Sequence, residues 1–449
     1  MEKSECLVLR NSVNCCITAH LIIITALPFL YLYLILTSCA SFPFSLSSRG
    51  PRFSIKNDPC PSGEVYVYHL PPMFNQDLLR NCPSLNPWNS RCQAITNGGL
   101  GQRATQQLAR VLPEHLAQAW HRTDQFMLEV IFHNRVLNHQ CRILEPESAT
   151  AIGKYLWTNY AAQKRDRDCA MLLRWITDQF YWKRSNGRDH FISLGRITWD
   201  FRLWEEKEWG SAFLNMPAMQ NVTRLLIERN PWDHLDIGVP CPTGFHPKSD
   251  ADVFLWQNYV SMHNRTTLFS FVGAPRGAVR NDFRGLLLSQ CRRESGFCRV
   301  VDCPRTRCIN GNSAILEAFL DSDFCLQPRG DSYTMTTAYD QYERFLPGKP
   351  ESYSVFVDHN EVKNNGTCIR RVLENYSREE VKKMKDKVID YIPKIVYAEK
   401  GLQSVKDAFD VALDGVLRRF KAQLQKTKVY SVIFSIVLHF QCLYYNDGP

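Results

Sequence analysis

Acidic side chains and a histidine flank one short apolar segment of this 449-residue sequence. Asp189 and His190 directly precede residues 191–194, and Asp200 follows them. An enzyme that activates a hydroxyl group needs a general base, and Asp, Glu and His are common choices. Any of the three could be that base, as could Glu228 or Asp233 near the next apolar segment. His190 could equally be a structural histidine at a sheet edge, and the spacing alone assigns no acid/base pair.

Two glycine turns could hold a phosphate group. Residues 273–277 read Gly-Ala-Pro-Arg-Gly and join a predicted strand to a predicted helix, with Arg276 and Arg280 close by. A diphosphate needs backbone N–H groups at a helix start and a cation. The second turn also follows a predicted strand and supplies the candidates Gly330, Asp331, Ser332 and Tyr333. For both turns the alternative is a plain solvent-exposed turn.

Two Asp-x-Asp pairs, at 250–252 and 321–323, could bind a divalent cation. Acidic residues two positions apart are common by chance. Asp250 is also a good N-cap for a helix that would carry Val253, Trp256 and Tyr259. We therefore expect structural roles for both pairs, and no metal.

Short apolar segments alternate with helical patterns, which predicts an α/β fold with a parallel, doubly wound sheet. Strands are expected at 64–68, 191–194, 225–227, 267–272, 298–301, 324–326 and 354–357. Helices are expected at 124–137, 280–291, 313–320, from a capping box at 377–380, and at 405–420. The apolar run 429–440 is too short for a membrane span, so it could be a buried helix or result from read-through in the gene.

Composition narrows the class of protein. The length suits two or three domains, or two lobes of one enzyme, and a hydrophobic fraction of 45% argues against disorder. The net charge of +9 is scattered rather than gathered in blocks, so nucleic acid is a poor candidate partner. The aromatic fraction of 12% suits sugar-binding clefts, although core packing explains most aromatic residues.

An N-terminal segment has the properties of a membrane anchor. Residues 11–48 contain no Asp, Glu, Lys or Arg, and 17–38 are long enough to span a bilayer as a helix. A cleaved signal peptide is the alternative, because residues 38–40 read Ser-Cys-Ala. The segment exceeds the usual length of a signal peptide core, so we expect an uncleaved anchor.

Cysteines and glycosylation sequons place the rest of the chain in an oxidising lumen. The chain has 17 Cys, which suits disulfides in the secretory pathway. The group at 291, 298, 303 and 308 could instead bind zinc, but disulfides fit the compartment better. Four Asn-x-Ser/Thr sites begin at Asn221, Asn264, Asn365 and Asn375.

Several longer motifs together resemble one protein family. Residues 324–334 read Phe-Cys-Leu-Gln-Pro-Arg-Gly-Asp-Ser-Tyr-Thr, and 187–191 and 195–201 read Gly-Arg-Asp-His-Phe and Gly-Arg-Ile-Thr-Trp-Asp-Phe. With the stretches at 128–135, 228–232, 245–250 and 268–276, they resemble the exostosin-like plant glycosyltransferases. The most similar branch is the xyloglucan galactosyltransferases of the Golgi, and the resemblance covers about residues 60–417.

The resemblance implies a fold, a reaction and a location. The fold would be GT-B, with two facing Rossmann-like lobes: 60–255 for the acceptor glycan and 256–417 for the UDP-sugar. Before them would come a cytosolic tail (1–16), the anchor (17–38) and a stem (39–59), and residues 418–449 would be an atypical tail. Galactose would pass from UDP-galactose to a xylosyl side chain of xyloglucan, with inversion and without an obligatory metal or other cofactor. The protein would be a single-pass type II protein of the Golgi membrane, with its catalytic body in the lumen and complexes with other cell-wall glycosyltransferases as further partners.

The chain departs from this family at two places. After Thr334 it lacks a helix-plus-strand unit that holds the sugar nucleotide in the family, including an Arg-Arg pair. Near residues 151–154 it lacks the end of another strand. A parallel sheet that loses a central strand leaves N–H and C=O groups unpaired. The alternative hypothesis is therefore an inactive or truncated family member that acts as a lumenal glycan-binding or partner protein.

Overall fold

The computed structural model describes most of the chain after residue 58. The described residues are 59–84, 92–145, 155–157, 162–203, 210–275, 282–303, 308, 313–328, 341–364, 366–426, 434–439 and 441–443. The expected cytosolic tail and anchor lie outside these ranges, as does the expected stem apart from Pro59. Within the described ranges, every helix is too short or too polar to cross a bilayer.

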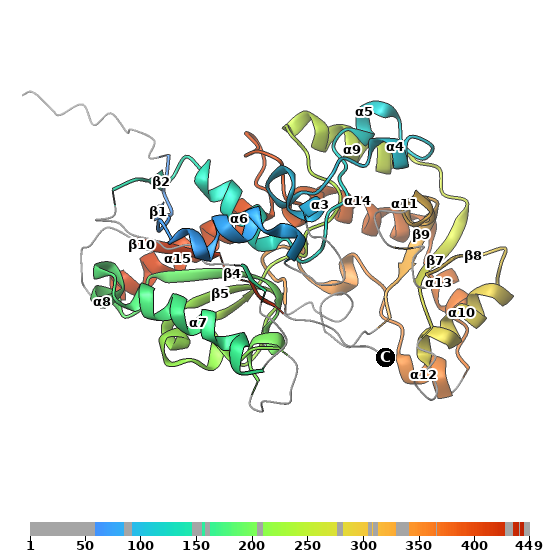
Figure 1. Ribbon diagram of the computed structural model, residues 1–449. Helices are drawn as coiled ribbons and strands as arrows, with labels where there is room; N and C mark the ends of the chain where they lie inside the picture. The colour runs from blue at the N-terminus through green and yellow to red at the C-terminus, as the bar shows by residue number, and fades with distance from the viewer. Residues whose placement is uncertain are drawn as a thin grey trace, which may run out of the picture. The chain divides into compact units, whose positions relative to one another are not determined.

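Strands and helices alternate along the chain (Figure 1). The strands are β1 (Glu64–Tyr66), β2 (Arg142–Ile143), β3 (Tyr155–Trp157), β4 (His190–Ile197), β5 (Thr223–Glu228), β6 (Asp236–Gly238), β7 (Thr267–Gly273), β8 (Cys298–Asp302), β9 (Ser322–Leu326), β10 (Phe434–His439) and β11 (Gln441–Leu443). The longer helices are α6 (Leu128–Leu137), α7 (Ala162–Thr177), α9 (Asp250–Met262), α10 (Phe283–Arg293), α11 (Ser313–Leu320), α14 (Arg378–Ile395) and α15 (Ala408–Lys426). Short helices include α2 (Gln76–Arg80), α3 (Cys92–Ile95), α4 (Thr105–Leu108), α5 (Glu114–Ala117), α8 (Phe180–Ser185), α12 (His359–Asn364) and α13 (Ile369–Glu374).

The main sheet has six strands in the order β2-β1-β10-β4-β5-β6, and every neighbouring pair is parallel. In Figure 1, α6 and α15 lie on one side of β4 and β5, and α7 and α8 lie on the other. The rings of Phe132 in α6 and Phe409 in α15 are 4.8 Å apart, and both are buried. Beside them Arg135 of α6 pairs with Asp407, just before α15. These contacts join two helices that are far apart in the sequence.

Two smaller sheets complete the described fold. One has the order β8-β7-β9 and is also parallel, and β11 pairs with β3. The fold is therefore mixed α/β with parallel sheets, as the sequence predicts. The capping box is confirmed, because Ser377 accepts the Glu380 N–H and the Glu380 carboxylate accepts the Ser377 N–H. The cysteines considered for zinc form disulfides instead, Cys291–Cys298 and Cys303–Cys308.

Four local predictions are wrong. Residues 354–357 form no strand, and no described strand pairs with them. For the apolar run at 429–440 the buried-helix alternative is wrong, because residues 434–439 form the strand β10 with hydrogen-bonding partners on both sides, whereas nothing tests the read-through alternative. Helix α6 begins at Leu128 rather than at residue 124. The N-cap of α9 is Ser249 rather than Asp250, since the Ser249 side chain accepts the Asp252 N–H.

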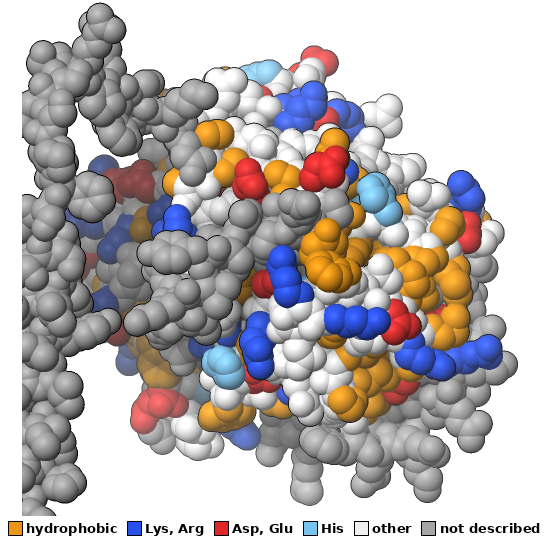
Figure 2. All heavy atoms as spheres, turned by 90° about the vertical axis from the view of Figure 1, so that its left-hand side faces the viewer, with side chains coloured by type: hydrophobic (Ala, Val, Ile, Leu, Met, Phe, Trp, Pro, Cys, Tyr) orange, Lys and Arg blue, Asp and Glu red, His pale blue; other side chains and the backbone are white. Residues whose placement is uncertain are grey.

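The surface agrees with the scattered charge of the sequence. Figure 2 shows one face on which Lys and Arg side chains are interspersed with acidic and hydrophobic ones. On this face the basic side chains form no continuous surface that would suit a nucleic acid.

Candidate functional site

The carboxyl ends of β4 and β5 bring acidic side chains to one edge of the main sheet. The two strands are parallel neighbours, and Ile197 at the end of β4 lies opposite Glu228 at the end of β5. Asp200 follows in the short 3-10 helix η5 (Thr198–Phe201). In open α/β sheets, ligands bind outside the carboxyl ends of the strands. This edge is the first candidate site.

Asp200 has the electrostatics of a general base. Its side chain is almost buried, and the Arg196 Nη1 lies 3.6 Å from its carboxylate. The pKa of Asp200 is raised to about 7, mainly by burial, with Arg196 opposing the rise and the nearby Glu228 contributing to it. A base whose pKa is close to the working pH can both accept and release a proton.

Glu129 of α6 lies directly behind this edge. A Cβ atom at Gly195 of β4 would collide with its carboxylate and with the Phe126 carbonyl oxygen, so only glycine lets α6 approach the strand this closely. Glu129 is fully buried, and burial raises its pKa to about 8. It is therefore protonated at neutral pH and adds no full negative charge beside Asp200.

Two tryptophans are exposed at the same edge. Trp199 in η5 is 40% exposed, and Trp232, in the loop after β5, is 83% exposed. Exposed apolar side chains that lie together, with a polar rim, can mark a binding surface. Flat aromatic faces beside a carboxylate suit a sugar.

An ion-pair network holds the two tryptophan-bearing segments together. Arg202, just after η5, donates to Thr198 at 2.9 Å and to Asp233 at 2.7 Å. Arg224 of β5 donates to Asp233 at 2.7 Å and to Asp236 at 2.8 Å. Although partial burial opposes it, these arginines hold the pKa of Asp233 well below its ordinary value. Asp233 thus acts as a charged anchor, which fits a structural role better than that of a base.

Asp189 and His190 lie at the opposite edge of the sheet, at the start of β4. His190 is fully buried, and its Nδ1 lies 2.5 Å from an Asp189 oxygen while its Nε2 lies 3.5 Å from the Tyr68 hydroxyl. Burial keeps the pKa of His190 below its ordinary value, although Asp189 opposes this. The structure does not bring these two residues together with Asp200.

Residues that follow the departure from the family at Thr334 contact the end of β5. The Gln341 side chain accepts the Arg229 N–H at 2.7 Å, and the Tyr342 hydroxyl donates to the Ile227 carbonyl oxygen. The free thiol of Cys241 lies close by and is half-buried. Loss of solvent around the thiol raises its pKa to about 12, so it is no nucleophile at neutral pH. The segment at residues 341–342, which follows this departure, therefore packs on the first candidate site.

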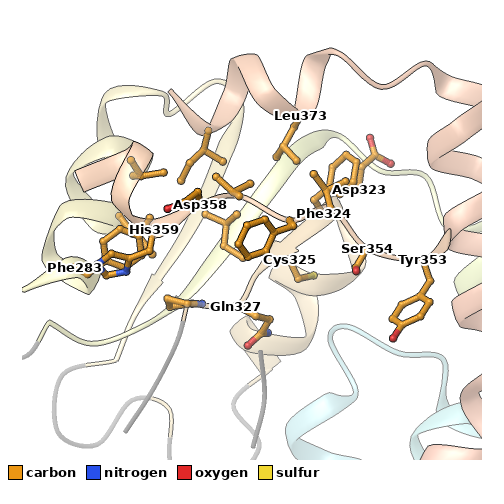
Figure 3. A pocket seen from close by; sticks show the side chains of 18 of the residues that line it. Phe283, Asp323, Phe324, Cys325, Gln327, Tyr353, Ser354, Asp358, His359 and Leu373 are labelled. Carbon is orange, nitrogen blue, oxygen red and sulfur yellow. The ribbon is translucent and has the colours of Figure 1, made fainter. Parts of the chain in front are cut away.

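A cavity of about 780 Å³ lies beside the sheet β8-β7-β9 (Figure 3). It is lined by β9, by residues 353–360 and by apolar side chains such as Leu287, Ile369 and Leu373. Phe283 and His359 stack at one end with ring centroids 3.9 Å apart. Neither Lys nor Arg is among the described residues that line it. This wall therefore offers no full positive charge to a diphosphate.

The predicted phosphate-binding residues are only partly described. Gly273 ends β7, where its carbonyl oxygen accepts the Cys303 N–H at 2.9 Å. The other candidates lie outside the described residues: Arg276, Arg280, Gly330, Asp331, Ser332 and Tyr333. Their role in donor binding stays a prediction.

The Asp-x-Asp pairs have protein partners. Asp250 accepts the backbone N–H groups of Gln403 and Ser404, and Asp321 pairs with Arg299 and His263. Within the described ranges, no three potential ligands come together around a metal-sized space.

The sequons differ in their surroundings. Asn264 and Asn375 are exposed, whereas Asn221 is half-buried and its Nδ2 donates to the Asn186 carbonyl oxygen at 3.1 Å. Asn365 lies outside the described residues.

Sequence reasoning missed Glu129, Trp199, Trp232 and Arg202. The motif at 195–201 could have indicated part of this site. It contains Gly195, which leaves space for Glu129, and also Trp199 and Asp200. Nothing in the local pattern linked this motif to residues 232–236.

Comparison with known proteins identifies relatives. Residues 59–372 match the Exostosin GT47 domain. The chain is 56% identical to the xyloglucan galactosyltransferase XLT2 of Arabidopsis thaliana over an alignment of 394 positions. This alignment covers 81% of this chain and 76% of XLT2. It is 36% identical to the xyloglucan galactosyltransferase MUR3 of the same plant, over 81% of this chain and 63% of that protein. It is 34% identical to the plant's xyloglucan-specific galacturonosyltransferase 1, over 80% of this chain and 57% of that protein. No solved structure matches the chain.

The alignment with XLT2 also bears on the missing segments. It is 394 positions long, whereas 81% of the 449-residue chain is about 364 residues. About 30 positions of XLT2 therefore have no counterpart in this chain.

Proposed function

The chain belongs to the exostosin GT47 family, and we propose that it is a xyloglucan galactosyltransferase that uses UDP-galactose as donor. The observation that carries this proposal is the 56% identity with XLT2 over 81% of the chain. The proposed acceptor is a xylosyl side chain of xyloglucan, and the similarity to two xyloglucan galactosyltransferases supports xyloglucan as the polysaccharide. One relative is a galacturonosyltransferase, so UDP-galacturonic acid is the donor to compare with UDP-galactose.

The proposed arrangement is GT-B, with the acceptor at the main sheet and the donor at the sheet β8-β7-β9. The exposed faces of Trp199 and Trp232 support an acceptor glycan at the carboxyl ends of β4 and β5. In the reaction Asp200 takes the proton of the acceptor hydroxyl as its oxygen bonds to the anomeric carbon of galactose. The bond from that carbon to the diphosphate breaks, and its electrons leave with UDP. Attack opposite to the leaving group inverts the anomeric centre.

The proposed location is the Golgi membrane, with residues 17–38 as a type II anchor and the catalytic body in the lumen. Disulfides such as Cys60–Cys141 and Cys82–Cys92 support an oxidising compartment. Complexes with other cell-wall glycosyltransferases are part of the same proposal. The reaction as proposed requires neither a metal nor another cofactor.

Two observations favour a second function, that of a lumenal glycan-binding protein without transferase activity. Among the described residues, neither Lys nor Arg lines the cavity beside β9. About 30 positions of XLT2 are also absent from this chain. Electrostatic stabilisation of the leaving group is usually the largest catalytic contribution at such sites. Without a cationic partner the diphosphate would leave slowly, while the tryptophan surface could still bind glycan.

Transfer of labelled galactose to galactose-free xyloglucan separates the two functions. We would compare the full chain with a form that carries the corresponding XLT2 segment after Thr334, using UDP-galactose and UDP-galacturonic acid as donors. Galactose transfer by the full chain supports the enzyme. Transfer only after the insertion, with glycan binding by both forms, assigns this chain to the second function. If both forms lack galactose transfer and glycan binding, both proposed functions are contradicted.

A further inference from the structure

The tail of the chain supplies a strand inside the main sheet. β10 pairs with β1 on one side, where Phe434 lies opposite Glu64, and with β4 on the other, where Ile436 lies opposite His190. Both pairings are parallel. Among the described strands, β1 and β4 have no direct pairing, and β10 connects the part β2-β1 with the part β4-β5-β6.

The sequence of β10 suits an interior position. Residues 434–439 read Phe-Ser-Ile-Val-Leu-His, with aromatic and β-branched residues typical of strands. Interior strands of parallel sheets carry near-continuous apolar runs, because helices cover both faces. Helices α6 and α15 both contact β10. This explains why an apolar run that is too short for a membrane occurs so late in the chain.

A second tail strand follows at once. β11 pairs in parallel with β3, and Gln441 lies opposite Tyr155. β3 begins directly after residues 151–154, where the sequence departs from its family. The second tail strand therefore pairs with the strand that follows this departure.

The spacing of a sheet shows what β10 provides. Neighbouring strands lie about 4.8 Å apart, so β1 and β4 are separated by about twice that distance, too far for a direct hydrogen bond. Without β10 the facing edges of both strands would have unpaired N–H and C=O groups beneath covering helices. β4 would keep only β5 as its partner, and β4 leads directly into the turn that carries Asp200.

We propose that the C-terminal tail is an integral part of the main sheet: β10 acts as its central strand and fixes the position of β4 and of the site at its end. The tail is thus a structural element of the site, supplied from the far end of the chain. This inference concerns the sheet and does not depend on which sugar is transferred.

Hydrogen exchange of the unmodified full chain tests the proposal directly. The amides of 434–439 should exchange at least about 100-fold more slowly than in the isolated peptide, and as slowly as those of β5, since stable sheet interiors open only through large-scale unfolding. Exchange of 434–439 at the rate of the free peptide would overturn the proposal.

A proline substitution tests the consequence for β4. Val437→Pro removes a ladder donor in the middle of β10, and it should raise the exchange rate of 191–193 at least about tenfold and lower the melting temperature by about 5 °C or more. Asp447→Pro, placed beyond both tail strands, is the control and should change neither. A Val437→Pro chain with unchanged exchange at 191–193 would overturn the proposal.

A truncated chain removes the ambiguity of a variant that fails to fold. A chain that ends at Lys426 should regain protection at 191–193 when a synthetic peptide of residues 429–443 is added, but not with a scrambled peptide. Full protection of 191–193 in the truncated chain without any peptide would overturn the proposal.

Discussion

Arg202 and Asp233 form an ion pair with an Nη2–Oδ2 distance of 2.7 Å, and this contact joins the turn after β4 to the loop after β5. The two segments carry Trp199 and Trp232, the exposed aromatic residues of the candidate acceptor site. The pair lies in a partly buried network with Arg224 and therefore holds its geometry better than an exposed pair would. The shape of the proposed glycan surface depends on it.

Arg202→Ala should destabilise the fold and weaken acceptor binding. The substitution leaves Asp233 and the buried Asp236 with one arginine instead of two, which should cost about 2 kcal/mol of unfolding free energy. Chemical denaturation and xyloglucan binding measure the two effects. Arg292→Ala removes a pair whose side chains are 61% and 37% exposed, and it should change stability by less than about 0.5 kcal/mol. Equal effects of the two substitutions would show that the network has no special role.

Asp200→Asn should lower kcat about 100-fold or more with little change in KM for xyloglucan, because it removes the proposed base and keeps the shape of the side chain. In the unsubstituted active form, kcat should rise with pH as Asp200 loses its proton near pH 7. Measurements use the full chain or the form with the inserted segment, whichever transfers galactose.

Asp189→Asn is the matched comparison for the catalytic prediction. Asp189 precedes β4 and Asp200 follows it, and eight strand residues separate the two edges by about 25 Å. We expect Asp189→Asn to reduce stability through His190 while the pH dependence of kcat is unchanged. If kcat no longer rises with pH in Asp189→Asn but still does in Asp200→Asn, the base is Asp189 or His190 at the start of β4 rather than Asp200.

Glu129→Gln should reduce the loss of stability at alkaline pH. Burial raises the pKa of Glu129 to about 8 from an ordinary value of 4.5, so between these values the folded state holds a proton that the unfolded state has lost. Stability therefore falls as pH rises through this range, by on the order of 2 kcal/mol between pH 6 and 8.5. Denaturation at both pH values should show a smaller fall in Glu129→Gln, whereas the exposed Glu114→Gln should match the unsubstituted protein. An equal fall in all three proteins would show that Glu129 is already ionised.

Glycosylation should distinguish the sequons. Asn264 and Asn375 are exposed, whereas a glycan on Asn221 would displace its hydrogen bond to Asn186. In microsomes, Asn264→Gln and Asn375→Gln should each remove one glycosidase-sensitive mass, and Asn221→Gln should remove none. The glycosylated chain should also resist added protease. A protease-accessible chain without glycan would contradict a lumenal body.

The sequence alone predicted the elements whose signals are local. Ser377 and Glu380 satisfy each other's backbone N–H groups within one turn, so the start of α14 follows from four residues. Strands such as β7 and β8 follow from apolar segments bounded by turn residues. The alternation of strands and helices then predicted a parallel α/β fold.

Tertiary structure decided what depends on distant partners. Residues 429–440 are apolar without a clear period, so only the free edges of β1 and β4 determine that β10 is a strand. The sequence could not choose among Asp189, His190 and Asp200 as the base. The extended strand β4 separates Asp189 from Asp200, and the burial that raises the pKa of Asp200 exists only in the folded chain. Short-range chemistry thus fixed the elements, and long-range packing determined which of their residues meet.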